Sequence, residues 1–183
     1  LGVGVLSSVG GVFHLFTHAF FKALLFLTAG SVMHAMAGQL DLRKLSGMRH
    51  KMPVTCWLMF VGCLALAGVP LTAGFFSKDL ILAYTLQAGI GDHGQTLYLL
   101  LAIVGLFTAF LTAFYTFRLW FRVFMGPEYY EMGEEHHGDE DEHEHGDAHG
   151  THAPHEPHEM PWWPMNAPLA VLAVGAIFAG WLG

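Results

Sequence analysis

The feature that most constrains this chain is a series of apolar segments, each long enough to cross a membrane. Residues 12–36 form the first, and residues 96–125 form a longer one. An α-helix needs about 20 predominantly apolar residues to cross the hydrocarbon core of a bilayer. Only 13% of the residues are charged, about half the fraction found in soluble domains. The sequence therefore predicts an all-α fold, a polytopic transmembrane helix bundle.

The chain divides into four parts by composition. We expect residues 1–11 to be the tail of a preceding helix and a turn, and residues 12–127 to form transmembrane helices. Residues 128–160 are predicted to be a disordered loop, and residues 161–183 the truncated start of a further transmembrane helix. Because the chain starts without methionine and stops inside an apolar run, we expect it to be a piece of a longer protein.

A proline and a glycine interrupt the middle of the membrane part. The apolar runs 54–69 and 71–86 are separated by Pro70, and Gly74 follows one turn later. This pattern predicts a discontinuous helix with its break at Pro70 and Gly74. Broken backbone at membrane depth is tolerated only where it is buried in protein or lines a wet cavity, and ion and proton paths use such breaks.

Three ionisable residues lie in the first apolar segment. His14, His18 and Lys22 are spaced by four, so on a helix they form one slowly drifting stripe. A lysine near the centre of a span costs roughly 2.5–3.5 kcal/mol on insertion scales. Histidine accepts and passes on a proton near neutral pH, so the stripe suits proton passage. The alternative is that Lys22 extends to an interface and that the histidines are hydrogen-bonded core residues.

Lys78 and Asp79 form a second ionisable station after the break. Adjacent residues on a helix point about 100° apart, so the two need not neutralise each other. In one interpretation Lys78 faces a channel while Asp79 faces a partner or a helix end. In the other, both residues anchor the chain at the membrane interface.

Residues 128–159 hold twelve of the fifteen acidic residues, eight histidines and no lysine or arginine. The rest of the chain is then +5, from eight bases minus three acids. Such a composition cannot bury a core and is typical of disorder. We weigh a tolerated loop expansion against a low-affinity zinc, nickel or copper buffer or a pH-responsive segment. No fixed ligand spacing is present, so no metal site is named, and nothing in the charge pattern suggests a nucleic-acid partner.

The basic residues leave the membrane orientation open. Both the connection at 38–53 and the pair Arg118 and Arg122 carry the positive charge expected on the cytoplasmic side. If the runs 54–69 and 71–86 are two separate spans, these two basic regions fall on opposite faces of the membrane.

Three motifs in order resemble one known family. Residues 14–34 (HLFTHAFFKALLFLTAGSVMH) resemble the signature helix of the antiporter-like L subunit of respiratory complex I, the proton-translocating NADH:quinone oxidoreductase. Residues 41–48 (DLRKLSGM) resemble the connection that follows it, and residues 66–82 (LAGVPLTAGFFSKDLIL) resemble the family's broken helix. Residues 115–118 (YTFR) look like the end of the next span.

The resemblance implies a membrane-arm subunit that conducts protons and has no redox or catalytic centre of its own. It implies that Lys22 is the lysine of a central buried polar axis, with His14 and His18 as its connectors. It also implies that Lys78 is the terminal lysine of a half-channel, and it leaves the role of Asp79 open. FMN, iron–sulfur clusters and quinone are then expected in other subunits of the complex.

The resemblance further implies location and partners. We expect a multi-pass protein of the inner, cytoplasmic membrane of a bacterium, bound to other membrane-arm subunits and to the bilayer, with the loop 128–159 on the cytoplasmic side. Two alternatives remain. One is the large subunit of a multisubunit sodium/proton antiporter, which shares the His/Lys helix. The other is a non-conducting membrane scaffold whose His-rich loop stores metal.

Overall fold

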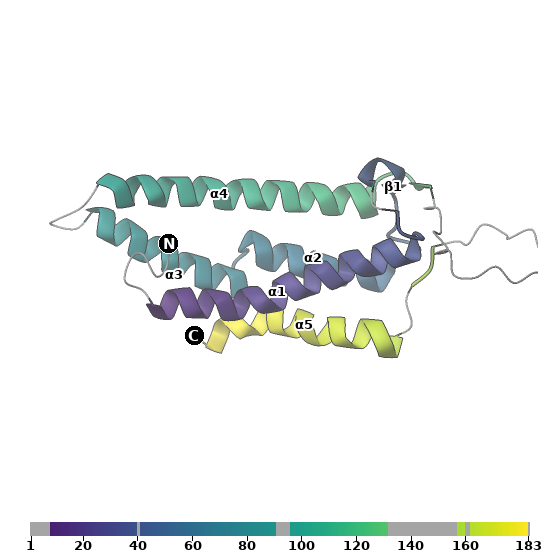
Figure 1. Ribbon diagram of the computed structural model, residues 1–183, viewed down its shortest axis with the longest axis horizontal. Coiled ribbons are helices and arrows are strands. Elements are labelled where there is room, and N and C mark those ends of the chain that lie inside the picture. The colour runs from purple at the N-terminus through teal and green to yellow at the C-terminus, as the bar shows by residue number, and fades with distance from the viewer. Residues whose placement is uncertain (1–7, 40, 91–95, 132–156, 160–161, 183) are drawn as a thin grey trace, which may run out of the picture.

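The computed structural model describes residues 8–39, 41–90, 96–131, 157–159 and 162–182. These residues form an elongated bundle of helices that lie roughly parallel to its long axis (Figure 1). Its α-helices are α1 (Ser8–Ala35), α2 (Pro53–Ala67), α3 (Ala73–Ile90), α4 (Thr96–Trp120) and α5 (Ala167–Phe178). The shorter elements are η2 (Leu42–Lys44), β1 (Leu45–Ser46), η3 (Phe121–Met125), β2 (Tyr129–Tyr130), η4 (Trp162–Asn166) and η5 (Ala179–Leu182).

Two of the helices are long and apolar enough to cross a membrane, Ser8–Ala35 and Thr96–Met125. The predicted helix bundle is confirmed by these elements. The expected turn before the first helix is wrong in its second half, because residues 8–11 already belong to α1. Gly10 is buried and Gly11 lines a cavity shared with α3 and α4, so packing outweighs the low helix propensity of glycine. Residues 1–7 lie outside the described part.

Helices α2 and α3 follow one another along the bundle as one interrupted span (Figure 1). They contain 15 and 18 residues, or about 22 and 27 Å at 1.5 Å per residue. The two helices run in the same direction along the bundle, so the chain passes from one end to the other only once in α2 and α3 together (Figure 1). The connection after α1 and the end of α4 therefore lie at the same end of the bundle, which removes the conflict between the two basic regions.

A tight turn joins the two halves of this span. Helix α2 ends at Gly68, whose φ of 77° is left-handed. Residues 69–72 then form a turn in which the Thr72 amide donates to the Val69 carbonyl at 3.1 Å. Pro70 takes the second position, and Leu71 takes the third with a φ of 77°, the pattern of a type II turn. The break thus spans Gly68 to Thr72.

Gly74 has a different place from the one predicted for it. It lies in the first turn of α3, two residues beyond the break. A Cβ at this position would lie 1.8 Å from the carbonyl oxygen of Ala65 in α2. The glycine therefore lets the start of α3 pack directly against the end of α2.

The first residues of the acidic segment are ordered, contrary to the predicted disorder. Strands β1 and β2 pair antiparallel, with Ser46 opposite Tyr129. Beside them the Lys44 ammonium lies 2.9 Å from the Glu131 carboxylate, and the Tyr129 hydroxyl donates to that same carboxylate. These bonds hold the pKa of Glu131 below its ordinary value, through Tyr129 first and Lys44 second, and the carboxylate raises the pKa of Lys44. The strand pair and the ion pair therefore fix residues 129–131, which composition alone had assigned to a disordered loop.

The last residues of the same segment are also held. The Glu159 carboxylate accepts from the backbone amides of Val54 and Thr55, at 2.9 and 3.3 Å, and from the Thr55 hydroxyl at 2.6 Å. A carboxylate at a helix N-terminus satisfies free amides and complements the helix dipole. Glu159 thus caps α2 from about a hundred residues away. The predicted loop between these two anchors, residues 132–156, lies outside the described residues.

Two buried clusters hold the bundle together. The first lies at the end where the connection, α2 and η3 meet, and there the Trp120 indole donates to the Cys56 carbonyl at 3.0 Å. The second joins α1 and α2 to α5. Its members are Phe21, Leu24, Ala65, Leu169, Ala173 and Ala176. Helix α5 and η5 occupy the part predicted as the start of a further transmembrane helix. Neither cluster fills the space between α1, α3 and α4, where a cavity lies.

Candidate functional site

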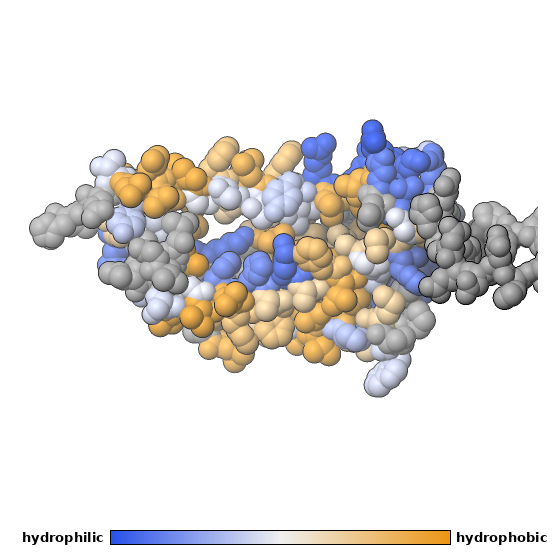
Figure 2. Space-filling view, viewed as in Figure 1, coloured by the Kyte–Doolittle hydropathy of each residue, from blue (hydrophilic) through white to orange (hydrophobic). Residues whose placement is uncertain are grey.

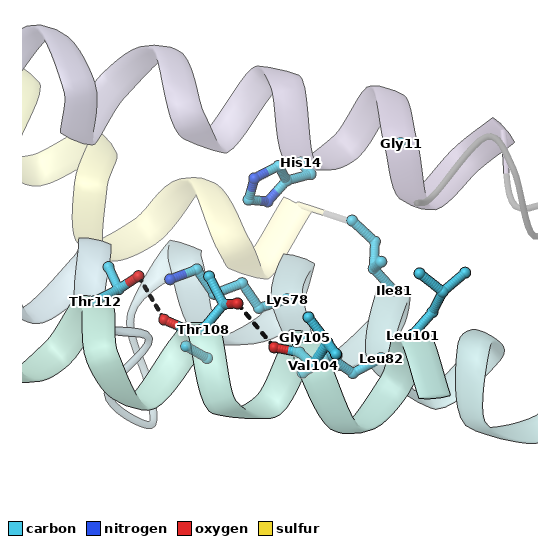
Figure 3. Close-up of a pocket in the computed structure, with 11 residues that line it drawn as sticks. Gly11, His14, Lys78, Ile81, Leu82, Leu101, Val104, Gly105, Thr108 and Thr112 are labelled. Atoms are coloured by element: carbon cyan, nitrogen blue, oxygen red, sulfur yellow. Dashed lines mark hydrogen bonds between the residues drawn. The ribbon is translucent and has the colours of Figure 1, made fainter. Parts of the chain in front are cut away.

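A cavity of about 580 Å³ lies between α1, α3 and α4 (Figure 3). Its walls are mostly aliphatic. Four side chains with polar groups line it: His14 from α1, Lys78 from α3, and Thr108 and Thr112 from α4. Figure 2 shows the corresponding hollow between α4 and α1, where hydrophilic residues lie among apolar ones. A titratable pair is therefore placed in an apolar cavity beside the break in the α2–α3 span.

The Lys78 ammonium donates to the backbone carbonyl of Leu66. This carbonyl is in the last turn of α2, where helix carbonyls have no partner within their own helix. The negative end of a helix dipole also favours a cation. Among the residues the structure describes, Lys78 forms no ion pair, and its neighbour Asp79 is exposed. The break therefore creates a neutral acceptor for this lysine.

His14 is held through its ring nitrogen. Its Nδ1 lies 3.0 Å from the Ser77 hydroxyl. The Thr17 hydroxyl lies 3.0 Å from the same Ser77 oxygen and 3.1 Å from the His14 carbonyl. Because a hydroxyl both donates and accepts, Ser77 can partner His14 in either tautomer or when the ring is charged. Ser77 is fully buried, so it ties the α1 stripe to the helix that carries Lys78.

The other predicted residues of the stripe lie progressively farther round α1. The ring centroids of His18 and His14 are 5.9 Å apart. Lys22 is exposed, with its ammonium 5.0 Å from the centre of the Phe26 ring. Eight residues advance a helix by about two turns and 80°, so Lys22 points away from the direction of His14. The structure brings His14 and Lys78 to one cavity, with His18 next to His14, and leaves Lys22 and Asp79 outside that cavity.

Sequence reasoning missed several polar members of the site. Ser77 and Thr17 connect the two helices, and Thr108 and Thr112 line the cavity from α4. The α4 hydroxyls donate along their own helix, Thr108 to Val104 and Thr112 to Thr108, each at 2.8 Å. The spacing of Thr108 and Thr112 by four would have marked a polar stripe on α4. Nothing in the sequence marks the contact of Ser77 with His14.

Comparison with known proteins identifies the family. A family model described as "NADH:quinone oxidoreductase/Mrp antiporter, TM" matches residues 1–112. "NADH-quinone oxidoreductase subunit L" of Campylobacter jejuni is 54% identical over 116 residues, which are 63% of this chain and 18% of the relative. The subunit L of Rickettsia conorii is 40% identical over all 183 residues, 23% of that relative. "NADH-ubiquinone oxidoreductase chain 5" of Triticum aestivum is 38% identical over 98% of this chain, again 23% of the relative.

The chain spans about a fifth of the length of the curated relatives it matches. The matched region contains α1, the interrupted span and most of α4, which together form the cavity. The resemblance read from the three motifs is confirmed. On these matches, the chain belongs to the NADH:quinone oxidoreductase/Mrp antiporter transmembrane family.

Proposed function

We propose that this chain is part of a proton-translocating membrane subunit of NADH:quinone oxidoreductase. In this proposal His14, His18, Lys22 and Lys78 carry protons, and Asp79 assists from the outer side of α3. The observation that carries the proposal is the cavity that His14 and Lys78 share beside the helix break. The relatives' names, all of subunits of such oxidoreductases, support the same assignment.

The arrangement is suited to moving a proton. The partner of Lys78 is a neutral backbone carbonyl and not a carboxylate. When Lys78 loses its proton, no negative charge is therefore left unpaired in the cavity. A buried unpaired charge would cost several kcal/mol. The cavity has room for several water molecules, since one occupies about 30 Å³ in the liquid. Water between Lys78 and His14 would give the proton a route, and Ser77 would keep the imidazole oriented.

The role proposed for Lys22 requires that residues from outside this chain surround its side chain. Its side chain is exposed on this chain, and a lysine facing lipid near the middle of a span costs roughly 2.5–3.5 kcal/mol. We propose that helices outside this chain cover this face and complete a central polar axis. The small share of each relative that the chain spans supports this view.

The charge distribution supports an orientation. Six of the eight lysines and arginines lie at the end of the bundle where β1 and β2 pair; they are Arg43, Lys44, Arg49, Lys51, Arg118 and Arg122. Residues 91–95, between the end of α3 and the start of α4, contain neither residue type. Positive residues are retained on the cytoplasmic side. We therefore assign the basic end, and the acidic segment that leaves it, to the cytoplasmic side of a bacterial inner membrane, in a multi-pass protein.

FMN, iron–sulfur clusters and quinone belong to other subunits in this proposal, and the partners of this chain are the bilayer and other membrane-arm subunits. The family description also includes antiporters. The two functions differ in what drives transport: proton transport tied to NADH oxidation supports the oxidoreductase, and sodium-dependent transport without it supports the antiporter.

The test is Lys78→Met in the full-length subunit, assembled in its complex and reconstituted in sealed vesicles. We expect fewer protons moved per NADH oxidised, with the amount of assembled complex unchanged. Lys51→Met is the matched control, because Lys51 is a lysine in the connection, away from the cavity. Unchanged pumping in Lys78→Met would refute the proposal. Deletion of residues 132–156 tests the metal-storing scaffold, which predicts loss of function where we expect little change.

A further inference from the structure

A second cavity lies at the basic end of the bundle, separate from the His14 and Lys78 site. It has a volume of about 870 Å³ and is open between the connection and the end of α4. Three arginines line it: Arg43 in η2, Arg118 in α4 and Arg122 in η3. Figure 2 shows hydrophilic surface in this region, where β1 meets the end of α4. We call this cavity the arginine groove.

The positive charge in the arginine groove is only partly neutralised. Arg43 makes a two-pronged contact with Asp41, with a closest distance of 2.9 Å. The Arg122 Nε donates to the Leu42 carbonyl at 3.2 Å, a contact that leaves the charge of this guanidinium uncompensated. Arg118 has no hydrogen bond or ion pair with any residue that the structure describes. Three arginines and one aspartate leave two positive charges for an anionic ligand.

The walls of the arginine groove are suited to a ligand with an apolar part. Tyr115 and Leu119 line it on α4, one turn before Arg118 and Arg122 respectively. Beyond Tyr115, the same helix continues as an exposed apolar surface toward the middle of the bundle, where Phe110 and Phe114 are 67% and 60% exposed. Helix α4 is 25 residues long, about 37 Å. A membrane-crossing helix of this length would place the arginines near its end at the depth of lipid headgroups, and Phe110 and Phe114 at the depth of acyl chains.

We propose that the arginine groove binds the headgroup of an anionic phospholipid, with its phosphodiester between Arg118 and Arg122 and its acyl chains along α4. The planar guanidinium fork matches two phosphate oxygens at once. Basic pockets between helices at the cytoplasmic side are typical sites for such headgroups. The apolar walls and the interfacial depth favour a lipid over free phosphate.

The experiment uses the full-length protein in its purified complex and photoactivatable phosphatidylglycerol as the probe. Labelling of residues 96–131 is measured by mass spectrometry after proteolysis. We expect labelling in the unmodified protein and at least a fivefold loss in Arg118→Gln, a variant that removes no hydrogen bond or ion pair with a described residue. Arg49→Gln is the control, because this exposed arginine lies at the same end but lines a different depression, and its labelling should be unchanged.

Two further probes distinguish an anionic phospholipid from other possible occupants of the arginine groove. Photoactivatable phosphatidylcholine should label the arginine groove at least fivefold less, and millimolar inorganic phosphate should not compete with phosphatidylglycerol. Equal labelling of Arg118→Gln and the unmodified protein would overturn the proposal. So would efficient competition by inorganic phosphate, which would assign the groove to the free ion. Absence of labelling in the unmodified complex would also overturn it, because the groove would then be covered by protein.

Discussion

The packing of Gly74 against α2 leads to a quantitative prediction for Gly74→Ala. A Cβ at this position would lie 1.8 Å from the Ala65 carbonyl oxygen and 3.0 Å from its carbon. Ordinary contacts between carbon and oxygen are about 3.3–3.6 Å. The two helices would have to separate by roughly 1.5 Å where they meet. Since both partners are backbone or Cβ atoms, no side chain can rotate to relieve the contact.

The magnitude follows from two opposing terms. Overpacking a tightly packed site costs about 1–3 kcal/mol, while Gly→Ala inside a helix gains about 0.5–1 kcal/mol. We expect a net loss of up to about 2.5 kcal/mol. The separation would also move the end of α2 away from Lys78, whose ammonium binds the Leu66 carbonyl. Proton pumping should therefore fall along with stability.

The matched control is Gly30→Ala. A Cβ at Gly30, also inside a helix, would have no atom within 4 Å, so this variant should be stabilised by about 0.5–1 kcal/mol. The assay is equilibrium unfolding of the full-length subunit in mixed detergent micelles, with helix content as the readout. If Gly74→Ala proves as stable as Gly30→Ala, the close packing of α2 and α3 is wrong.

Two further predictions concern the turn and the strand pair. Leu71 is 63% exposed and has a left-handed φ, which costs a non-glycine residue about 1–2 kcal/mol; in the same unfolding assay Leu71→Gly should raise stability and Leu71→Val should lower it. The lowered pKa of Glu131 means that its bonds stabilise the β1–β2 pair above its ordinary value of 4.5 and are lost as pH falls below that value. The raised pKa of Lys44 means that this ion pair is lost at the alkaline end only as pH rises above the ordinary lysine value of 10.5. Hydrogen-exchange protection of the Glu131 amide, which donates to the Lys44 carbonyl, should be constant from pH 7 to 5 and fall below 4.5. Glu131→Gln should remove that acid dependence, and an unchanged profile in this variant would contradict the assignment.

The elements of the site were predictable, and their mutual arrangement was only partly so. Hydropathy and Pro70 located the interrupted span, and the spacing of four placed the ionisable residues on one helix. Spacing along a helix does not say which angle faces the protein. His14 and Lys22 differ by about 80° round α1, and the packing of α1 against α3 decided that His14 faces the cavity. Ser77 was missed for the same reason, since its role depends on a helix sixty residues away.

The acidic segment shows how averaging over composition fails. Over residues 128–159, twelve acids and eight histidines outweigh everything else. The ordered contacts come from its edges, where Tyr129 and Tyr130 have high strand propensity and Glu159 finds the free amides at the start of α2. Neither partner is close in sequence, so a window along the chain could not reveal them.

The two anchors of the acidic segment have a consequence for engineering. Glu131 binds Lys44 and Glu159 binds Thr55, so the chain leaves the bundle and re-enters it at two fixed points of one surface. For a flexible connection between fixed points, each doubling of length costs only about 0.6 kcal/mol. Lengthening the chain between the anchored residues Glu131 and Glu159 should therefore cost the helix bundle little stability. The stretch between residues 132 and 156 is therefore a suitable place to insert a fluorescent reporter or an affinity tag.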